Sequence, residues 1–325
     1  MKIIGDNAHL HKSICTCIPS DRSFICMYIN ESSNRSNSFP DALFMDVVNE
    51  EIGRMLPPIR GYENQPLVSL EEAIQPVAQH FTNIDANVHV AKKNCAKLDD
   101  SLTVDESAAI YLYTMAFDDK PNLYEILNSS LRNANRRQLK PWSLFLKLFL
   151  TALYKLPSSS RTVWRCVRGV DLTSVYPKGK DIVWWGVGSC IGDVSMLEDD
   201  RFLGKNNAGT LFFIESRNAK SIRQYSCEKD TIEEIILMPG SFFRVNDHMP
   251  AKNDLRVIHL VEHAPPFTLL ETPLISRQVL SQQRTVQEMA GITESKTTIV
   301  RARPFDEFLV QSPTTDKPTE PSDKP

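Results

Sequence analysis

The sequence predicts an α+β protein in which a helical lobe precedes a mixed, largely antiparallel β core. Residues 69–156 carry apolar side chains at helical spacing, and the chain after residue 157 forms short β-branched and aromatic runs separated by turn residues. Because no long helix separates these runs, a doubly wound parallel sheet is not expected. The 325 residues divide into a partly flexible N-terminal extension (1–64), the helical lobe (65–157), the β-rich core (158–265), a C-terminal extension (266–311) and a disordered tail (312–325).

Composition and charge exclude several classes of protein. Hydrophobic residues at 42% and charged residues at 24% exclude a wholly disordered chain, and a net charge of −3 gives no reason to expect a nucleic-acid partner. No run reaches the ~20 apolar residues of a membrane-spanning helix, and residues 1–29 lack the apolar core of a signal peptide. The seven scattered cysteines have no spacing typical of a metal site. We therefore expect no membrane span, no metal, and a cytoplasmic or unspecified location.

Helix positions follow from apolar spacing and from capping signals. A first short helix is expected over residues 42–55, where the apolar pattern stops before two prolines. Two helix starts are expected where a hydroxyl residue precedes a glutamate by three positions, because the two side chains bind free N–H groups of the first turn. These capping boxes are Ser69 with Glu72 and Thr103 with Glu106. Further helices are expected over 124–132 and 141–156, the latter with proline in its first turn.

The β core is expected to contain six strands, each rich in β-branched and aromatic residues and bounded by turn residues. They cover residues 162–167, 181–187, 210–214, 233–238, 242–245 and 255–261.

An arginine lies in the middle of the first of these strands. Burying a guanidinium among apolar residues is costly without a partner. Arg165 therefore either pairs with an anion in a cleft or lies at a sheet edge where it reaches solvent, and the pattern alone leaves both interpretations open. Arg168, three residues further on, is the competing arginine.

Two other strands carry polar residues at an end. The run 184–190 finishes in small residues, where glycines let a ligand or a second backbone approach and Ser189 supplies a hydroxyl, although a bulge or turn is the alternative. In the strand that follows Ile232, Glu233 and Glu234 point to opposite faces, so that one carboxylate faces inward. Such an inward carboxylate is either paired structurally or catalytic.

The order of these residues resembles the R-S-E class of ADP-ribosyltransferases, and more closely the arginine-specific mono-ADP-ribosyltransferase family. The likeness covers about residues 62–262 and rests on four segments. They are Val163-Trp164-Arg165, where the family has aromatic-Arg-Gly and this chain continues with Cys166; Gly188-Ser189-Cys190, at the family's Ser-Thr-Ser segment; Phe202 with the strand after it; and Tyr124 to Arg132 in the helical lobe.

The resemblance implies a cleft in which NAD, or NADP, donates ADP-ribose to a protein acceptor, arginine in this family, and nicotinamide is released without a metal. Glu234 would accept a hydrogen bond from the ribose 2′-hydroxyl beside a developing positive charge, with Ser189 keeping the carboxylate aimed. Arg165 would hold the diphosphate or the nearby ribose. Phe202 would stack on the nicotinamide, and the backbone of Cys166 would bind its carboxamide. Glu234, Ser189 and Arg165 are therefore the expected catalytic residues, and all five are expected to bind NAD.

The sequence departs from the family at the first acid of its Glu-x-Glu motif. If Glu234 is the second acid, Ile232 occupies the first position, and an isoleucine cannot accept a proton from an acceptor. A shift of one residue would make Glu233 the catalytic acid with Thr231 upstream, and Glu228 could approach the acceptor from another direction. The alternatives to a transferase are therefore an NAD glycohydrolase and a degenerate member that binds NAD or a protein.

Overall fold

The computed structural model describes residues 46–50, 52–96, 101–193, 195–196, 208–249 and 254–274. All of them belong to the second of the two units into which the chain divides, residues 38–325. Most of the predicted extensions (1–45 and 275–311) and the predicted tail (312–325) lie outside the described residues.

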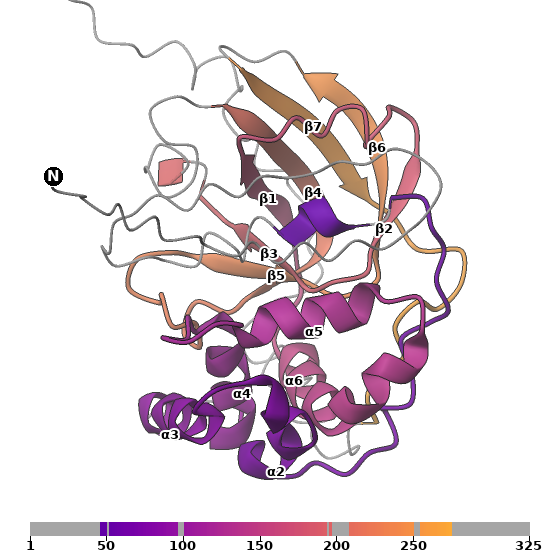
Figure 1. The fold of residues 1–325 in the computed structure, drawn as a ribbon. Coiled ribbons are helices and arrows are strands. Elements are labelled where there is room, and N and C mark those ends of the chain that lie inside the picture. The colour runs from indigo at the N-terminus through magenta and orange to yellow at the C-terminus, as the bar shows by residue number, and fades with distance from the viewer. Residues whose placement is uncertain are drawn as a thin grey trace, which may run out of the picture. The chain divides into compact units, whose positions relative to one another are not determined.

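The described part of the chain begins with helices, as the apolar spacing predicts (Figure 1). The α-helices are α2 (Leu70–Ile74), α3 (Ile84–Cys95), α4 (Val104–Thr114), α5 (Leu123–Arg132) and α6 (Ser143–Lys155), and the 3-10 helices are η1 (Asp46–Asn49), η2 (Gln75–His80) and η3 (Arg136–Trp142). Ser69 and Thr103 cap α2 and α4, because each hydroxyl accepts a hydrogen bond from the N–H three residues further on. Glu106 completes the second capping box by accepting from the N–H of Thr103.

The second half of the described chain forms one seven-stranded sheet. Its strands are β1 (Ser159–Arg168), β2 (Asp181–Trp184), β3 (Gly188–Ile191), β4 (Gly209–Ser221), β5 (Glu234–Leu237), β6 (Ser241–Met249) and β7 (Leu255–Glu262). The strand order is β1-β3-β5-β4-β7-β6-β2, with a further pairing between β1 and β4. Only β4 and β7 run parallel among these pairs, which confirms the mixed, largely antiparallel core.

The long strand β4 controls how the other strands are arranged. It pairs with β1, β5 and β7, and β3 bridges β1 and β5, so that β1, β3, β5 and β4 form a closed ring of pairings. This ring brings together the strands that carry the predicted arginine, serine and glutamate, although these residues are far apart in the sequence.

Three expected boundaries are wrong. The predicted helix over 42–55 does not continue past Asn49, because Gly53 takes a left-handed conformation (φ +82°) and the described residues after η1 are not helical. The predicted strand 181–187 stops at Trp184, and a separate strand begins at Gly188. The last helix begins at Ser143, and Pro141 lies inside η3 and not in the first turn of α6.

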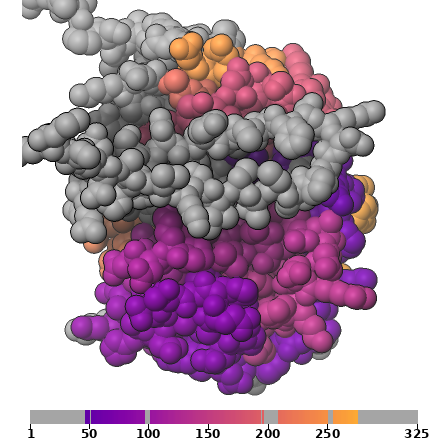
Figure 2. Space-filling view, viewed as in Figure 1, coloured from indigo at the N-terminus to yellow at the C-terminus, as the bar shows by residue number. Residues whose placement is uncertain are grey.

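Two clusters of buried apolar residues hold this unit together. The larger one joins the helical lobe to the strands and includes Leu127 and Phe149 from helices and Ile236 from β5. The smaller one lies among the strands and includes Val163 and Trp184. The space-filling view shows helical segments and strand segments gathered at different ends of this face (Figure 2). None of the helices in the described ranges is both long enough and apolar enough to cross a membrane.

Candidate active site

Glu234 is the first residue of β5, and its side chain is completely buried (0% exposed). Its Oε2 accepts a hydrogen bond of 2.8 Å from the hydroxyl of Ser226, whereas Oε1 has no hydrogen-bond partner among the described residues. Burial raises the pKa of Glu234 from 4.5 to about 7, because the charged form loses its hydration, and the hydroxyls of Ser226 and Ser189 partly offset this rise. Such a carboxyl group changes its charge near neutral pH and keeps one oxygen free.

Ser189 of β3 lies on the same side of the sheet as Glu234. The two strands are antiparallel, with Ser189 opposite Ile236 and Ile191 opposite Glu234, so the serine and the glutamate are diagonal neighbours. The Ser189 hydroxyl is fully buried and has no hydrogen bond of standard geometry with a described residue, but it lies near enough to the Glu234 carboxylate to lower its pKa as a weak donor. Ser189 Oγ and Glu234 Oε1 are therefore two buried polar atoms with capacity for a ligand.

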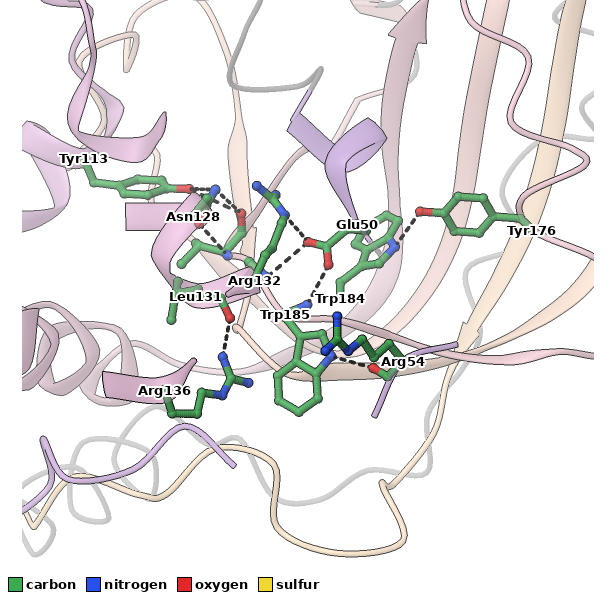
Figure 3. Close-up of polar contacts among 12 residues, drawn as sticks. Glu50, Arg54, Tyr113, Asn128, Leu131, Arg132, Arg136, Tyr176, Trp184 and Trp185 are labelled. Carbon is green, nitrogen blue, oxygen red and sulfur yellow. Dashed lines mark hydrogen bonds and ion pairs between the residues drawn. The ribbon is translucent and has the colours of Figure 1, made fainter. Parts of the chain in front are cut away.

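Helix α5 holds the segment that leads into β3 (Figure 3). Asn128, completely buried on α5, accepts a hydrogen bond of 2.9 Å from the N–H of Val187 and donates one of 3.1 Å to its carbonyl. The hydroxyl of Tyr113 on α4 donates to the same carbonyl at 3.3 Å. Side chains of the helical lobe thus satisfy both backbone groups of Val187, and this fixes where the strand of Ser189 begins.

A buried ion pair holds the two preceding residues (Figure 3). Glu50 Oε1 lies 2.7 Å from Nε of Arg132 on α5, and the same carboxylate accepts hydrogen bonds from the N–H groups of Trp185 and Gly186, each at 3.1 Å. A Cβ atom at Gly186 would lie 2.7 Å from Arg132 Nη2, so only glycine fits there without displacing the guanidinium. Side chains therefore bind the N–H groups of residues 185–187, and no strand pairing forms between Trp184 and Gly188.

Arg165 is buried in the middle of β1 (1% exposed), so it is not an arginine at a sheet edge that reaches solvent. Its guanidinium lies 5.5 Å from the ring centroid of Trp184, and its Nη1 is 3.5 Å from the position of a Cβ atom at Gly188. Along β1 its neighbours Trp164 and Cys166 pack in the larger cluster, so Arg165 points to the other side. The guanidinium therefore contacts β3 from the side that carries Trp184 and Gly188, which is opposite the side of Ser189 and Glu234. The structure thus brings the predicted serine and glutamate together but does not place the predicted arginine beside them.

The structure places the two adjacent acids, Glu233 and Glu234, in different environments. Glu233 is partly exposed and forms an ion pair with Arg161, with 2.6 Å between Oε1 and Nη1. Glu234 is the inward member of the pair. Ile232 is 1% exposed and packs in the larger cluster, so the position of the family's first acid is filled by a core side chain.

Of the remaining predicted residues, Cys166 and Arg168 lie in β1. Phe202 lies outside the described residues, and its contact with nicotinamide stays a prediction. Cys166 is buried, and its backbone pairs with that of Leu211 in β4. Arg168 is exposed at the end of β1.

Sequence reasoning missed Ser226 and Glu50. Ser226 lies in a polar turn that carries no periodic signal, and nothing in its neighbourhood points to a residue eight positions further on. Glu50 and its partner Arg132 are 82 residues apart, so no local pattern joins them. Glu228, which the sequence did suggest, lies in the turn before β5, accepts a hydrogen bond of 2.8 Å from Thr231 Oγ1, and raises the pKa of Glu234 through its charge.

Fold and site together define a class: an α+β protein in which a mixed sheet gathers a buried carboxyl group and a buried hydroxyl, with a buried arginine on the adjoining strand. Comparison with known families agrees. The family model for NAD:arginine ADP-ribosyltransferase matches residues 37–263, well over half of the chain. The chain belongs to this family and is an NAD-dependent mono-ADP-ribosyltransferase.

Solved structures give distant similarities. They include the type III effector XopAI from Xanthomonas axonopodis pv. citri (16% identity, TM-score 0.46, 69% of this chain and 90% of that chain), HopU1 of Pseudomonas syringae pv. Tomato DC3000 (17%, 0.44, 62% and 100%) and the ADP-ribosyltransferase Vis from Vibrio splendidus in complex with agmatine (17%, 0.41, 64% and 92%). No curated protein matches the chain. The family assignment therefore rests on the family model.

Proposed function

We propose that this protein transfers ADP-ribose from NAD to arginine side chains of an acceptor protein and releases nicotinamide. One observation supports this most: the buried Glu234 and Ser189 keep one carboxylate oxygen and one hydroxyl without partners among the described residues. Buried polar atoms are normally satisfied, so this pair fits a polar ligand. Ribose hydroxyls have the donors and acceptors that the pair needs.

The residue types suit cleavage of the bond between nicotinamide and ribose. As this bond breaks, nicotinamide leaves with the electron pair, positive charge grows on the ribose, and an acceptor nitrogen forms the new bond and loses a proton. An ionised Glu234 would accept from the ribose 2′-hydroxyl and stabilise the growing charge, and Ser189 would keep the carboxylate aimed. Arg165 lies on the other side of these strands, where it supports β3 beside Gly188, so its expected contact with the diphosphate or the adjacent ribose stays a prediction. The backbone of Cys166 would bind the carboxamide, and Phe202 would stack on the nicotinamide.

The acceptor assignment depends on a second acid. Ile232 cannot take a proton and is buried in the core, so we propose that Glu228 assists the acceptor in its place. Its carboxylate is near enough to Glu234 to influence the pKa of that group, and it is only half-buried, so an incoming guanidinium can reach it. A guanidinium between two carboxylates is a favourable arrangement.

The alternative is an NAD glycohydrolase, or a member that binds NAD or a protein and turns over little. The isoleucine at position 232 favours this alternative, because it removes the acid that activates an acceptor while leaving Glu234 in place.

The test is nicotinamide release from NAD by the purified protein, with and without agmatine as an arginine analogue. Transfer predicts faster release with agmatine and formation of ADP-ribosyl-agmatine. Equal release in both cases, with free ADP-ribose as product, indicates hydrolysis, and no release indicates a binding protein. Replacing NAD by NADP in the same assay tests which dinucleotide is used.

Two substitutions assign the acids. Glu234→Gln should reduce release at least ~100-fold while NAD binding survives, since the lost charge acts mainly in the transition state. Glu228→Gln should reduce transfer to agmatine more than hydrolysis. Glu233→Gln is the matched control, because that neighbouring acid is paired with Arg161 and should not be needed for turnover. Normal turnover by Glu234→Gln would mean that the wrong acid was chosen.

A further inference from the structure

Ser226 has one proton, and its surroundings leave one place for it. Its Oγ accepts a hydrogen bond of 3.1 Å from the N–H of Glu228 and lies 2.8 Å from Oε2 of Glu234. A hydroxyl that accepts from an N–H on one side can still donate on the other. The Ser226 proton therefore points at Glu234, which is the arrangement that stabilises an ionised carboxylate.

The turn that carries Ser226 is anchored at both ends. The N–H of Ser226 donates to the carbonyl of Ile222 at 2.9 Å, and the N–H of Cys227 donates to the hydroxyl of Thr114 on α4 at 2.9 Å. Ser226 itself is completely buried. The hydroxyl is therefore held in place by the backbone and by the helical lobe, independently of Glu234.

A second serine, Ser216, makes the same two kinds of hydrogen bond, but both oxygens of its glutamate partner are bound. The Ser216 hydroxyl accepts from the N–H of Asn218 at 3.3 Å and donates to the buried Glu262 at 2.6 Å. Glu262 also accepts hydrogen bonds from the N–H of Arg217 and from the Asn218 side chain, so both of its oxygens are bound. Glu234, by contrast, has no hydrogen-bond partner for Oε1 among the described residues, so the Ser226 bond fixes one oxygen and leaves the other available to a ligand.

We propose that Ser226 is a positioning residue of the transferase: it holds Oε2 of Glu234, favours the ionised form of the carboxyl group, and aims Oε1 at the substrate. The inference rests on the proposed function, because it takes Glu234 as the acid that acts on NAD. The partial offset of the raised Glu234 pKa by Ser226 agrees with it.

Other titratable groups lie near Glu234 and take part in the electrostatics of its carboxyl group. The charge of Glu228 raises the Glu234 pKa, and the thiol of Cys227 interacts with both carboxylates. On α4, Tyr111 forms a hydrogen bond with Cys227. The pH dependence of each variant's unfolding free energy must therefore be compared with that of the same variant in a Glu234→Gln background.

The test compares Ser226→Ala with Ser226→Thr, which keeps a hydroxyl, and with Ser216→Ala, which removes the matched bond elsewhere. For Ser226→Ala we expect kcat for nicotinamide release to fall ~10-fold or more at pH 7, with KM for NAD changed less than ~3-fold, because the lost bond acts on the charged acid. The acidic limb of the pH profile should move to higher pH, so that part of kcat returns at about pH 9. Ser226→Thr should recover most of the activity, and Ser216→Ala should leave the profile unchanged.

A second measurement does not need turnover. The loss of unfolding free energy caused by Ser226→Ala should grow from pH 5 to pH 8, as Glu234 ionises, and should not vary with pH in the Glu234→Gln background. If Glu234→Gln is inactive but Ser226→Ala keeps the wild-type kcat and pH profile, the inference about Ser226 is wrong while the catalytic acid stands. If Glu234→Gln keeps normal turnover, the proposed function fails and the role of Ser226 falls with it.

Discussion

At the scale of single residues, the decisive feature is a carboxyl group placed where its charge is costly. Glu234 has no exposed surface, and its folded pKa of about 7 lies above the ordinary 4.5 because burial removes hydration. Structural carboxylates are usually paired and have lowered pKa values. A raised carboxyl pKa beside a buried hydroxyl is more typical of a functional site, where the arrangement of groups lowers the stability of the fold.

This raised pKa predicts how stability depends on pH. Between about pH 4.5 and 7 the folded protein keeps a proton that the unfolded chain has released, so the stability from this group is fully present below 4.5 and is lost as pH rises through about 7. Glu234→Gln removes the titration, and the variant should exceed the wild type by roughly 3 kcal/mol at pH 8 and match it near pH 4.5. Urea unfolding at the two pH values measures this. Glu233→Gln should not reproduce the crossover, and a pH-independent difference for Glu234→Gln would contradict the assigned shift.

Strand alternation predicted that one of Glu233 and Glu234 faces inward, and the small residues after Trp184 pointed to Ser189. The choice of Glu234 came from the family resemblance, and the structure places Glu234 as the buried acid. The sequence could not identify Ser226, whose role depends on how a turn folds back onto β5. The sequence also could not show that Arg165 lies on the opposite side of the strands from Glu234 and Ser189, because that depends on how β1 pairs with β3 and β4. The contact of Arg165 with NAD stays a prediction.

At the scale of elements, the helical lobe positions β3 through side-chain contacts with its backbone. Asn128 binds Val187, and the pair of Glu50 and Arg132 binds Trp185 and Gly186. These contacts explain why the strand predicted over 181–187 ends at Trp184 and a separate strand, β3, begins at Gly188. Residues 181–187 have a continuous strand composition, but side chains distant in sequence take the N–H groups that a strand would use. The helix expected over 42–55 ends early for a different reason, because apolar spacing does not reveal that Gly53 takes a left-handed conformation.

Breaking the ion pair between Glu50 and Arg132 should be strongly destabilising because both side chains are buried. The side chains of Arg132 and Glu50 are 10% and 2% exposed. Glu50→Gln removes the buried carboxylate charge that faces the Arg132 guanidinium and should lower the unfolding free energy by ~3 kcal/mol or more. Asp181→Asn is the matched control, since Asp181 pairs with Arg244 at a similar distance of 2.8 Å but with both side chains largely exposed. Urea unfolding at neutral pH should resolve a large loss for the first variant and a far smaller one for the second. Equal losses of unfolding free energy in the two variants would mean that burial of the Glu50–Arg132 pair does not increase the cost of breaking it.

At the scale of the whole folded unit, helices and strands share one hydrophobic cluster. Leu127 and Phe149 of the helical lobe pack in the same cluster as Ile236 of β5 and as Ile232, which lies just before that strand. The α+β class and the order of helices before strands were predictable, because they follow from local apolar periodicity. The strand order was not, since the pairing of β4 with β1, β5 and β7 joins segments whose sequences carry no mark of their partners.

A shared cluster predicts that the helical lobe and the sheet unfold together. The four tryptophans provide a selective probe, because Trp142 lies at the end of η3 and the other three lie in or beside β1 and β2. Their fluorescence therefore reports mainly on the sheet, whereas circular dichroism at 222 nm reports mainly on the helices. We expect the two signals to give the same urea midpoint, as in a two-state transition.

The same experiment on Phe149→Ala sharpens the test. Phe149 is completely buried on α6, where its ring stacks on that of Phe145, so its truncation should cost ~3–5 kcal/mol. If lobe and sheet are one cooperative unit, this helical substitution should lower the fluorescence midpoint as much as the circular dichroism midpoint. A shift of the helical signal alone would show that the lobe unfolds by itself. The strand that carries Ser189 would then lose its support from α5 before the sheet itself is lost, and nicotinamide release should disappear at the lower of the two midpoints.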